Sequence, residues 1–139
     1  MPSSQTSLPQ LEVLRVSKNR IKSLPEGLSS SSLRLLDLTG NLLTRLPDDL
    51  GQLPKLVELL VGSNDLLTLP SSLARLTALR RLHLNSNNLT TNALENVDWS
   101  GGYLQHLWLQ HNKIRRLPET ILANESLRPN VQCDPGLLP

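Results

Sequence analysis

Histidine, cysteine and carboxylate side chains are the groups in this 139-residue chain that could hold a metal ion or carry catalysis. Its three histidines, His83, His106 and His111, fall close together in the sequence, and neutral imidazole is a common zinc ligand. A closed zinc site takes four ligands, however, and no thiol or carboxylate stands with these three. The pattern therefore predicts neither a metal centre nor a bound cofactor.

Two further sets of residues could do chemistry. Asp48 and Asp49 are adjacent carboxylates that could share acid–base work, but they follow Pro47, where carboxylates favour the start of a short helix. Cys133 is the only cysteine, so it cannot form a disulfide within the chain. The sequence has no glycine-rich phosphate loop and no serine, histidine and acid constellation. We therefore predict a protein that is not an enzyme and has no small-molecule substrate.

The elements that must position these side chains follow a repeat. One frame, L-x-x-L-x-[LV]-x-x-N-x-[LI], occurs five times in a chain that contains 35 leucines. The asparagines of the frame are 22, 23, 23 and 25 residues apart, and they are Asn19, Asn41, Asn64, Asn87 and Asn112. Aromatic residues make up only 2% of the chain, so the core must be built from leucine in repeated layers.

Each frame predicts one short β-strand. Apolar and polar residues alternate at its centre, which is the period of a strand with one buried face. A single short strand cannot bury that face alone, so successive strands are expected to stack into one parallel sheet. The asparagine follows the strand where the chain turns inward, and its amide can both donate hydrogen bonds to buried backbone and accept them. The five asparagines therefore predict a structural ladder.

The second part of most repeats begins with Leu-Pro, at residues 24–25, 46–47, 69–70 and 117–118. Leucines then recur every three residues, as at 50, 53 and 56, which predicts a short helical or 3₁₀ return behind the sheet. The fourth repeat lacks Leu-Pro and is two residues longer than its neighbours. Trp99 lies in it, and we expect this side chain to fill the space of a missing leucine rather than to bind a partner at the surface.

On these residues, the chain resembles a leucine-rich-repeat protein, and its Leu-Pro units resemble the typical intracellular class that includes Ras-suppressor-like proteins. The resemblance implies an α/β solenoid: a horseshoe segment with a parallel β-sheet on the concave face and short 3₁₀, helical or irregular turns on the convex face. It places about five repeats in residues 8–127. Residues 1–7 are then expected to be a disordered N-terminal segment, and residues 128–139 either a C-terminal cap or a disordered tail.

The sequence predicts no membrane span, because no apolar stretch approaches the roughly 20 residues that a bilayer-spanning helix needs. The N-terminus lacks the charged start and apolar centre of a secretory signal, and no cysteine-rich flank of the extracellular kind is present. We therefore expect a cytoplasmic protein.

Binding specificity in such a solenoid would lie on strand side chains that point away from the core. These candidate partner-binding residues are mostly polar, and they are Arg15, Asp37, Glu58, Leu60, Arg81, His83, Asn85, His106, Trp108 and Gln110. They could be ordinary solvated side chains. We favour a binding role, because Trp and Arg dominate the energetics of protein interfaces and Trp108 falls among the histidines.

The resulting prediction is a non-catalytic scaffold that binds a protein partner through its concave face, and that could be one subunit of a larger assembly. Five strands about 4.8 Å apart offer less than the roughly 800 Å² per partner of a standard interface, so we expect weak or peptide-sized binding. Two alternatives stay open. The net charge of +2 and the side chains of Arg80, Arg115 and Arg116 would suit a structural RNA-contacting subunit of a ribonucleoprotein. The chain could also be a fragment of a longer leucine-rich-repeat receptor or ubiquitin ligase.

Overall fold

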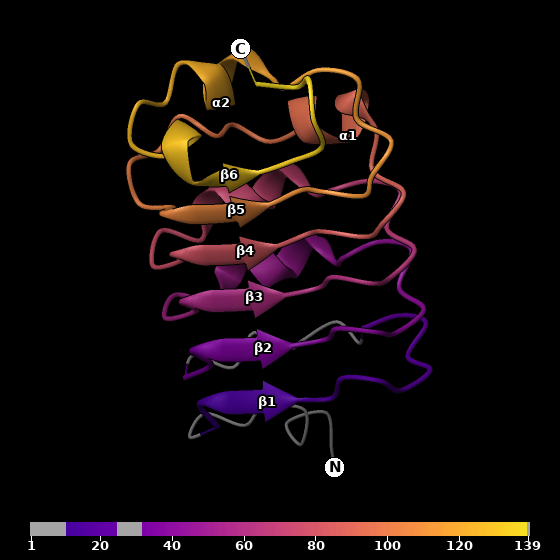
Figure 1. The fold of residues 1–139 in the computed structure, drawn as a ribbon. Coiled ribbons are helices and arrows are strands. Elements are labelled where there is room, and N and C mark those ends of the chain that lie inside the picture. Colours follow the sequence, from indigo (N-terminus) through magenta and orange to yellow (C-terminus); the bar gives the residue numbers. More distant parts are fainter. Residues whose placement is uncertain (1–10, 25–31, 139) are drawn as a thin grey trace.

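The computed structural model describes residues 11–24 and 32–138, which form one parallel β-sheet with short helices and irregular segments behind it (Figure 1). The strands are β1 (Val13–Arg15), β2 (Leu35–Asp37), β3 (Glu58–Leu60), β4 (Arg81–His83), β5 (His106–Trp108) and β6 (Val131–Gln132). They lie in sequence order, and each is parallel to the next. The segment 1–7, predicted to be disordered, lies outside the described residues, as does Pro25 of the first Leu-Pro pair.

The central leucine of each frame explains where the strands form. Leu36, Leu59, Leu82 and Leu107 are register partners along the sheet, and all four are buried. Each strand is short, because one inward leucine with its two outward neighbours completes it. The predicted solenoid with a parallel sheet is therefore confirmed.

The asparagine frame does not predict the sixth strand. Val131 pairs with Leu107 and Gln132 with Trp108, so the tail extends the sheet beyond the fifth repeat. The backbone N–H of Leu109 also donates a hydrogen bond to the carbonyl of Gln132 at 2.6 Å. The structure thus has one strand more than the five that the frame predicts.

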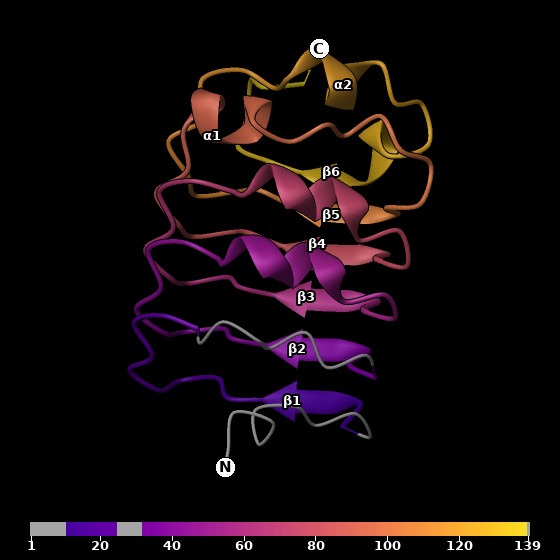
Figure 2. The same cartoon turned by 180° about the vertical axis from the view of Figure 1, so that it is seen from behind.

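Short helices lie behind the sheet (Figure 2): the 3₁₀ helices η2 (Asp48–Gln52) and η3 (Ser71–Arg75), and the α-helices α1 (Thr91–Glu95) and α2 (Glu119–Leu122). A further 3₁₀ helix, η4 (Arg128–Asn130), leads directly into β6. A proline in extended conformation directly precedes η2, η3 and α2, and its fixed φ directs the chain into the helical turn. Leu50 of η2 and Leu73 of η3 are buried against the core. The predicted short helical returns are therefore confirmed. None of the helices among the described residues is long and apolar enough to cross a membrane.

The irregular fourth repeat is filled by Trp99, as predicted. Its side chain is 5% exposed, and its indole N–H donates to the carbonyl of Leu94 at 2.9 Å. The helix α1 supplies that carbonyl, and Thr90 caps the helix by accepting a hydrogen bond from the N–H of Ala93. A cavity of about 20 Å³ beside Trp99 and Tyr103 has room for a single water molecule. The indole of Trp99 thus fills core space in the one repeat that has no Leu-Pro pair.

The first repeat is less buried than those that follow. Leu14 and Val16 are half-buried, whereas Leu36 and Leu38, at the same places in the second repeat, are fully buried. Val13 on β1 is 48% exposed. Among the described residues, the central apolar side chains of the strands are therefore least buried at β1 and buried from β2 onward.

Candidate functional site

The solvent-facing side of the sheet, which we call the sheet face, carries two rows of side chains that flank the central leucines. By register, the first row is Val13, Leu35, Glu58, Arg81 and His106. The second row is Arg15, Asp37, Leu60, His83, Trp108 and Gln132. Eight of the ten predicted binding residues stand in these rows, and the other two, Asn85 and Gln110, follow β4 and β5 by two positions.

Trp108 on β5 stacks with two histidines, and we call these three rings the Trp108 cluster. The ring centroids of Trp108 and His83 are 3.9 Å apart, with 23° between the planes. His106, two residues earlier on the same strand, lies at 5.7 Å and 29°. All three side chains are half-buried. An indole held by neighbouring rings has little conformational freedom left to lose, so the cluster is already ordered in the isolated chain.

The environment of His83 favours its neutral form. Burial lowers the pKa of this imidazole from its ordinary value, and Arg81 acts in the same direction. The carboxylates of Glu58 and Asp37 oppose that shift, but burial is the largest effect. In this neutral form, the ring stacks on Trp108 without the desolvation of an imidazolium.

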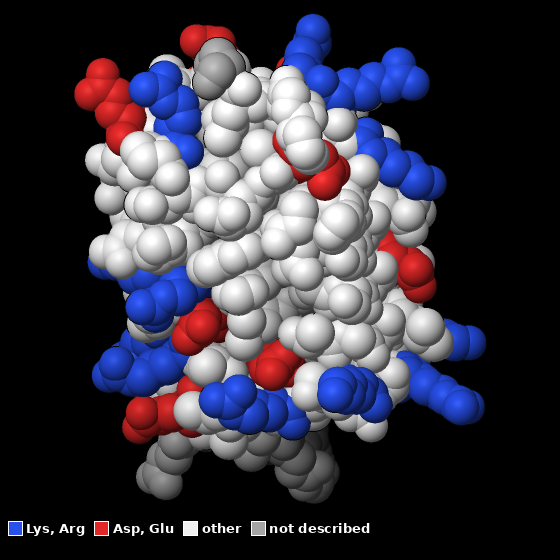
Figure 3. Space-filling view, in the orientation of Figure 1, with Lys and Arg blue, Asp and Glu red and all other residues white. Residues whose placement is uncertain are grey.

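Charges are distributed unevenly over the sheet face. Arg15 and Asp37 form an ion pair, with 3.7 Å between the guanidinium nitrogen and the carboxylate oxygen. Glu58 and Arg81 are register neighbours, yet within the described part of the chain neither forms an ion pair. The two rows carry carboxylates on β2 and β3 and only cationic or uncharged groups on β4 to β6. Figure 3, which looks onto this face, shows the charged side chains mainly along its margins and towards β1.

Two amide side chains extend the sheet face beyond the strand ends. Gly62 leaves room for Asn85, because a Cβ at position 62 would lie 2.9 Å from the Asn85 amide oxygen. The amide oxygen of Gln110 is buried and has no hydrogen-bond partner among the described residues. Both residues add hydrogen-bonding groups one pleat beyond His83 and Trp108.

The asparagines of the frame lie where the chain turns inward after each strand. The Asn64 amide donates to the carbonyls of Leu38 at 3.0 Å and Val61 at 3.2 Å, and its oxygen accepts from the N–H of Leu43 at 3.1 Å. The amide also donates to the carbonyl of Gly62 at 3.1 Å, so two bonds lie within its own repeat and two reach the preceding repeat. Asn41, Asn87 and Asn112 likewise bond both to their own repeat and to the preceding one. Within residues 11–24 and 32–138, the exposed Asn19 donates only to carbonyls of its own turn.

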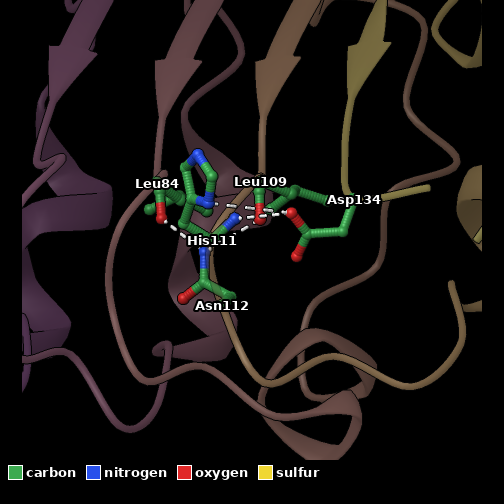
Figure 4. A network of polar contacts seen from close by, with 5 residues as sticks. All are labelled: Leu84, Leu109, His111, Asn112 and Asp134. Atoms are coloured by element: carbon green, nitrogen blue, oxygen red, sulfur yellow. Dashed lines mark hydrogen bonds and ion pairs between the residues drawn. The ribbon is translucent and has the colours of Figure 1, made fainter.

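His111 does not join the Trp108 cluster. Its backbone N–H donates to a carboxylate oxygen of Asp134 at 2.9 Å, and its ring nitrogen Nδ1 lies 4.0 Å from the same oxygen (Figure 4). Through these contacts, Asp134 links the C-terminal tail to the loop that follows β5. Over residues 11–24 and 32–138, no three His, Cys, Asp or Glu side chains lie close enough together to hold a metal ion.

The other residues considered for chemistry lie apart from the Trp108 cluster. Asp48 and Asp49 occupy the first turn of η2, behind the sheet. Cys133 is half-buried at the end of β6, and burial, together with the nearby Asp134 carboxylate, raises the pKa of its thiol. A raised pKa opposes formation of the reactive thiolate.

Two of the three arginines considered for RNA contact are engaged within the chain. The guanidinium of Arg80 donates to the carbonyls of Thr77 at 3.0 Å and Leu79 at 3.2 Å. Arg116 lies 3.8 Å from the carboxylate of Glu95. Arg115 is exposed. The three therefore do not form a common basic surface of free guanidinium groups.

The residue before each frame asparagine has a left-handed backbone, and sequence reasoning missed this feature. The φ angles are 58° at Lys18, 73° at Gly40, 57° at Ser63, 58° at Ser86 and 62° at His111. This conformation turns the chain so that the asparagine enters the core, and it is strained for residues other than glycine. Gly40 was the one signal in the sequence, because glycine adopts positive φ without a steric cost.

Comparison with known proteins places the repeats among established ones. A family model described as "Leucine rich repeat" matches residues 9–66 and, in an overlapping match, residues 31–89; a second such model matches residues 103–124. An uncharacterized leucine-rich repeat-containing protein of Schizosaccharomyces pombe is 46% identical over 65 residues, which are 45% of this chain and 10% of that protein.

Solved structures agree with the fold. A leucine-rich-repeat protein of Leptospira interrogans superposes with a TM-score of 0.79 and 28% identity, over 91% of this chain and 32% of its own. The structure of the Toll–Spätzle complex from Drosophila gives a TM-score of 0.71 and 29% identity, over 96% of this chain and 18% of its own. The chain therefore spans a third or less of each of these relatives.

Proposed function

Because the chain belongs to the leucine-rich-repeat family, we propose that it is a non-catalytic scaffold that binds a protein partner through its sheet face. Leucine-rich-repeat domains generally serve protein–protein interaction, and one of the similar solved structures is the Toll–Spätzle complex. The observation that carries the proposal for this chain is the Trp108 cluster. It presents a half-buried indole, stacked on His83, at the solvent-facing side of the sheet.

The size of the sheet face limits the partner. Six strands about 4.8 Å apart span about 24 Å, so a contact confined to the strands is smaller than the roughly 800 Å² per partner of a standard interface. A peptide-sized segment matches this area. A larger partner would also have to contact the loops at the margins, where the charged side chains gather (Figure 3).

The finer assignment rests on sequence features. The Leu-Pro units and their 23-residue spacing support the intracellular, Ras-suppressor-like subclass, and with it a cytoplasmic location and a place in a larger assembly. RNA is the less favoured partner, because Arg80 and Arg116 already have partners within the chain. The alternative that the chain is one part of a longer receptor or ligase agrees with the share of each relative that it spans.

The test of this function compares three immobilised forms of the chain in native extract. Trp108→Ala should weaken capture of the protein partner about thirtyfold, because an aromatic anchor at the centre of an interface typically contributes at least about 2 kcal/mol. Gln52→Ala, an exposed position on η2 behind the sheet, is the matched control and should capture like the wild type. If all three forms retain the same proteins with the same efficiency, the sheet face is not the binding surface.

A further inference from the structure

We propose that the sheet face binds an extended peptide segment in which a carboxylate side chain lies between Arg81 and His106 and an apolar side chain two positions away packs on Trp108. This inference rests on the proposed function, because it names the class of partner for the same face. Its basis is the placement of one free guanidinium, one imidazole and one indole on β4 and β5.

Arg81 and His106 are suited to hold one carboxylate together. They are register partners on adjacent parallel strands, so their side chains leave the sheet about 4.8 Å apart. A carboxylate has two oxygens and can accept a hydrogen bond from each neighbour, and an ionised acceptor strengthens both bonds. Arg81 is exposed and has no ion pair within the described part of the chain, so its guanidinium can bind without first leaving a partner.

Arg80, the neighbour of Arg81 in the sequence, does not have a guanidinium that is available for binding. The Arg80 guanidinium donates to the carbonyls of Thr77 and Leu79, close to its own place in the chain. Arg81 makes no such contact with the described residues and belongs to the first row of the sheet face. The two neighbours have the same chemistry and different surroundings, which makes Arg80 a matched control for Arg81.

Trp108 sets the distance between the two anchor side chains of the peptide. It follows His106 by two residues on the same strand, and residues i and i+2 of a strand project on one side about 6.6 Å apart. An extended peptide laid along β5 has the same period, so an acidic residue over His106 places the residue two positions on over Trp108. The expected pattern in the partner is therefore one acidic and one apolar residue with a single residue between them.

The charges around the cluster favour an anionic group on β4 and β5 and disfavour it elsewhere. The two rows carry no carboxylate on β4 to β6, whereas Glu58 on β3 and Asp37 on β2 would repel an acidic side chain. Asp37 is already paired with Arg15, and Glu58 has no ion pair within the described part of the chain. The carboxylate of the peptide is therefore held on the β5 side of Arg81, next to Trp108.

The test is a selection of random peptides displayed on phage against the immobilised full chain. The same selection is run on Arg81→Gln, on Trp108→Ala and on the matched control Arg80→Gln, after circular dichroism has shown that each variant is folded. On the wild type and on Arg80→Gln, peptides with Asp or Glu two positions from a large apolar residue should be enriched. One enriched peptide, synthesised and titrated by fluorescence anisotropy, should bind Arg81→Gln about tenfold more weakly and Arg80→Gln within about twofold of the wild type.

Two results would overturn the inference in distinguishable ways. Peptides that depend on Trp108 but carry no acidic position, or that bind Arg81→Gln as tightly as the wild type, refute the acidic class of partner and leave the binding function of the sheet face intact. Peptides that bind Trp108→Ala as well as the wild type, or a selection that enriches nothing on the wild type, contradict the proposed function as well.

Discussion

The indole ring of Trp108 and the imidazole ring of His83 lie 3.9 Å apart between centroids, although 25 residues separate them in the chain. The two residues are register partners on β5 and β4, so the leucine frame makes them neighbours. Strands β1 to β5 pair all three of their residues in the same way. Side chains on the sheet face therefore meet across repeats, and the contact surface is set by repeat length more than by local sequence.

The two tryptophans should respond oppositely to truncation. Trp99→Ala removes a buried ring from the fourth repeat and should cost roughly 3 to 5 kcal/mol of unfolding free energy. Trp108→Ala removes a half-buried ring and its stacking with His83, and should cost about 1 kcal/mol. Urea denaturation of both variants measures the difference. A larger loss for Trp108→Ala than for Trp99→Ala would contradict the assignment of the two rings to the sheet face and the core.

Acidification should destabilise the chain through His83. Because burial lowers the pKa of this imidazole in the folded state, the unfolded chain binds more protons between the lowered value and the ordinary value of about 6.5. The stability that the neutral ring contributes is complete above that ordinary value and is lost as the pH falls through the lowered pKa. The wild type should therefore lose more unfolding free energy between pH 7.5 and pH 5 than His83→Gln does.

The same titration can be followed directly by NMR of the His83 ring protons. Glu58→Gln removes the carboxylate that most strongly raises the pKa of His83, so the titration midpoint should move to lower pH in that variant. A midpoint that moves to higher pH in Glu58→Gln, or a wild-type midpoint above about 6.5, would show that burial does not control this group.

The leucine frame predicted most of the fold because each constrained position has one physical role. Leu36 and Leu59 mark strand centres, and the Leu-Pro pair at 46–47 marks the start of η2. The frame fails at β6 because the tail has other residues at the same places. Counting from the pairing of Val131 with Leu107, Cys133 stands at the place of Leu109 and Gly136 at the place of Asn112. β6 therefore pairs with β5 although its residues do not follow the leucine and asparagine frame.

The candidate site was predictable by position and less so by contact. Alternation along the strands placed His83, His106 and Trp108 on one side of the sheet, but it did not indicate that their rings stack. The frame left His111 out of the candidate residues, but it did not indicate the left-handed backbone of this residue or its bond to Asp134, which depend on the tail. The guanidinium of Arg80 is hydrogen-bonded within the chain, and that of Arg81 has no ion pair among the described residues. This difference depends on side-chain conformation, which the spacing of residues does not determine.

The frame asparagines should be far more important for stability than the asparagine beside them. Asn64→Ala leaves the buried N–H of Leu43 without its hydrogen-bond partner, which costs about 1 to 3 kcal/mol, whereas the carbonyls of Leu38 and Val61 keep the amides of Asn41 and Asn87. Asn88→Ala removes a half-buried side chain and should change the unfolding free energy by no more than about 0.5 kcal/mol. Thermal melts of the two variants compare them, and equal shifts would contradict the ladder.

The left-handed position before each frame asparagine offers the last prediction. Ser63→Gly relieves a strained φ of 57° and should stabilise the chain by about 0.5 to 1 kcal/mol after the entropy of glycine is counted. Gly40→Ala should destabilise it by about 1 kcal/mol through φ alone, because the nearest atoms to the new Cβ lie at an ordinary 3.5 Å. Gly102→Ala is the control, since its Cβ would have no neighbour within 4 Å and its φ lies outside the left-handed region. Urea denaturation of the three variants should therefore show one gain, one loss and little change; a loss for Ser63→Gly would mean that the turn does not store this strain.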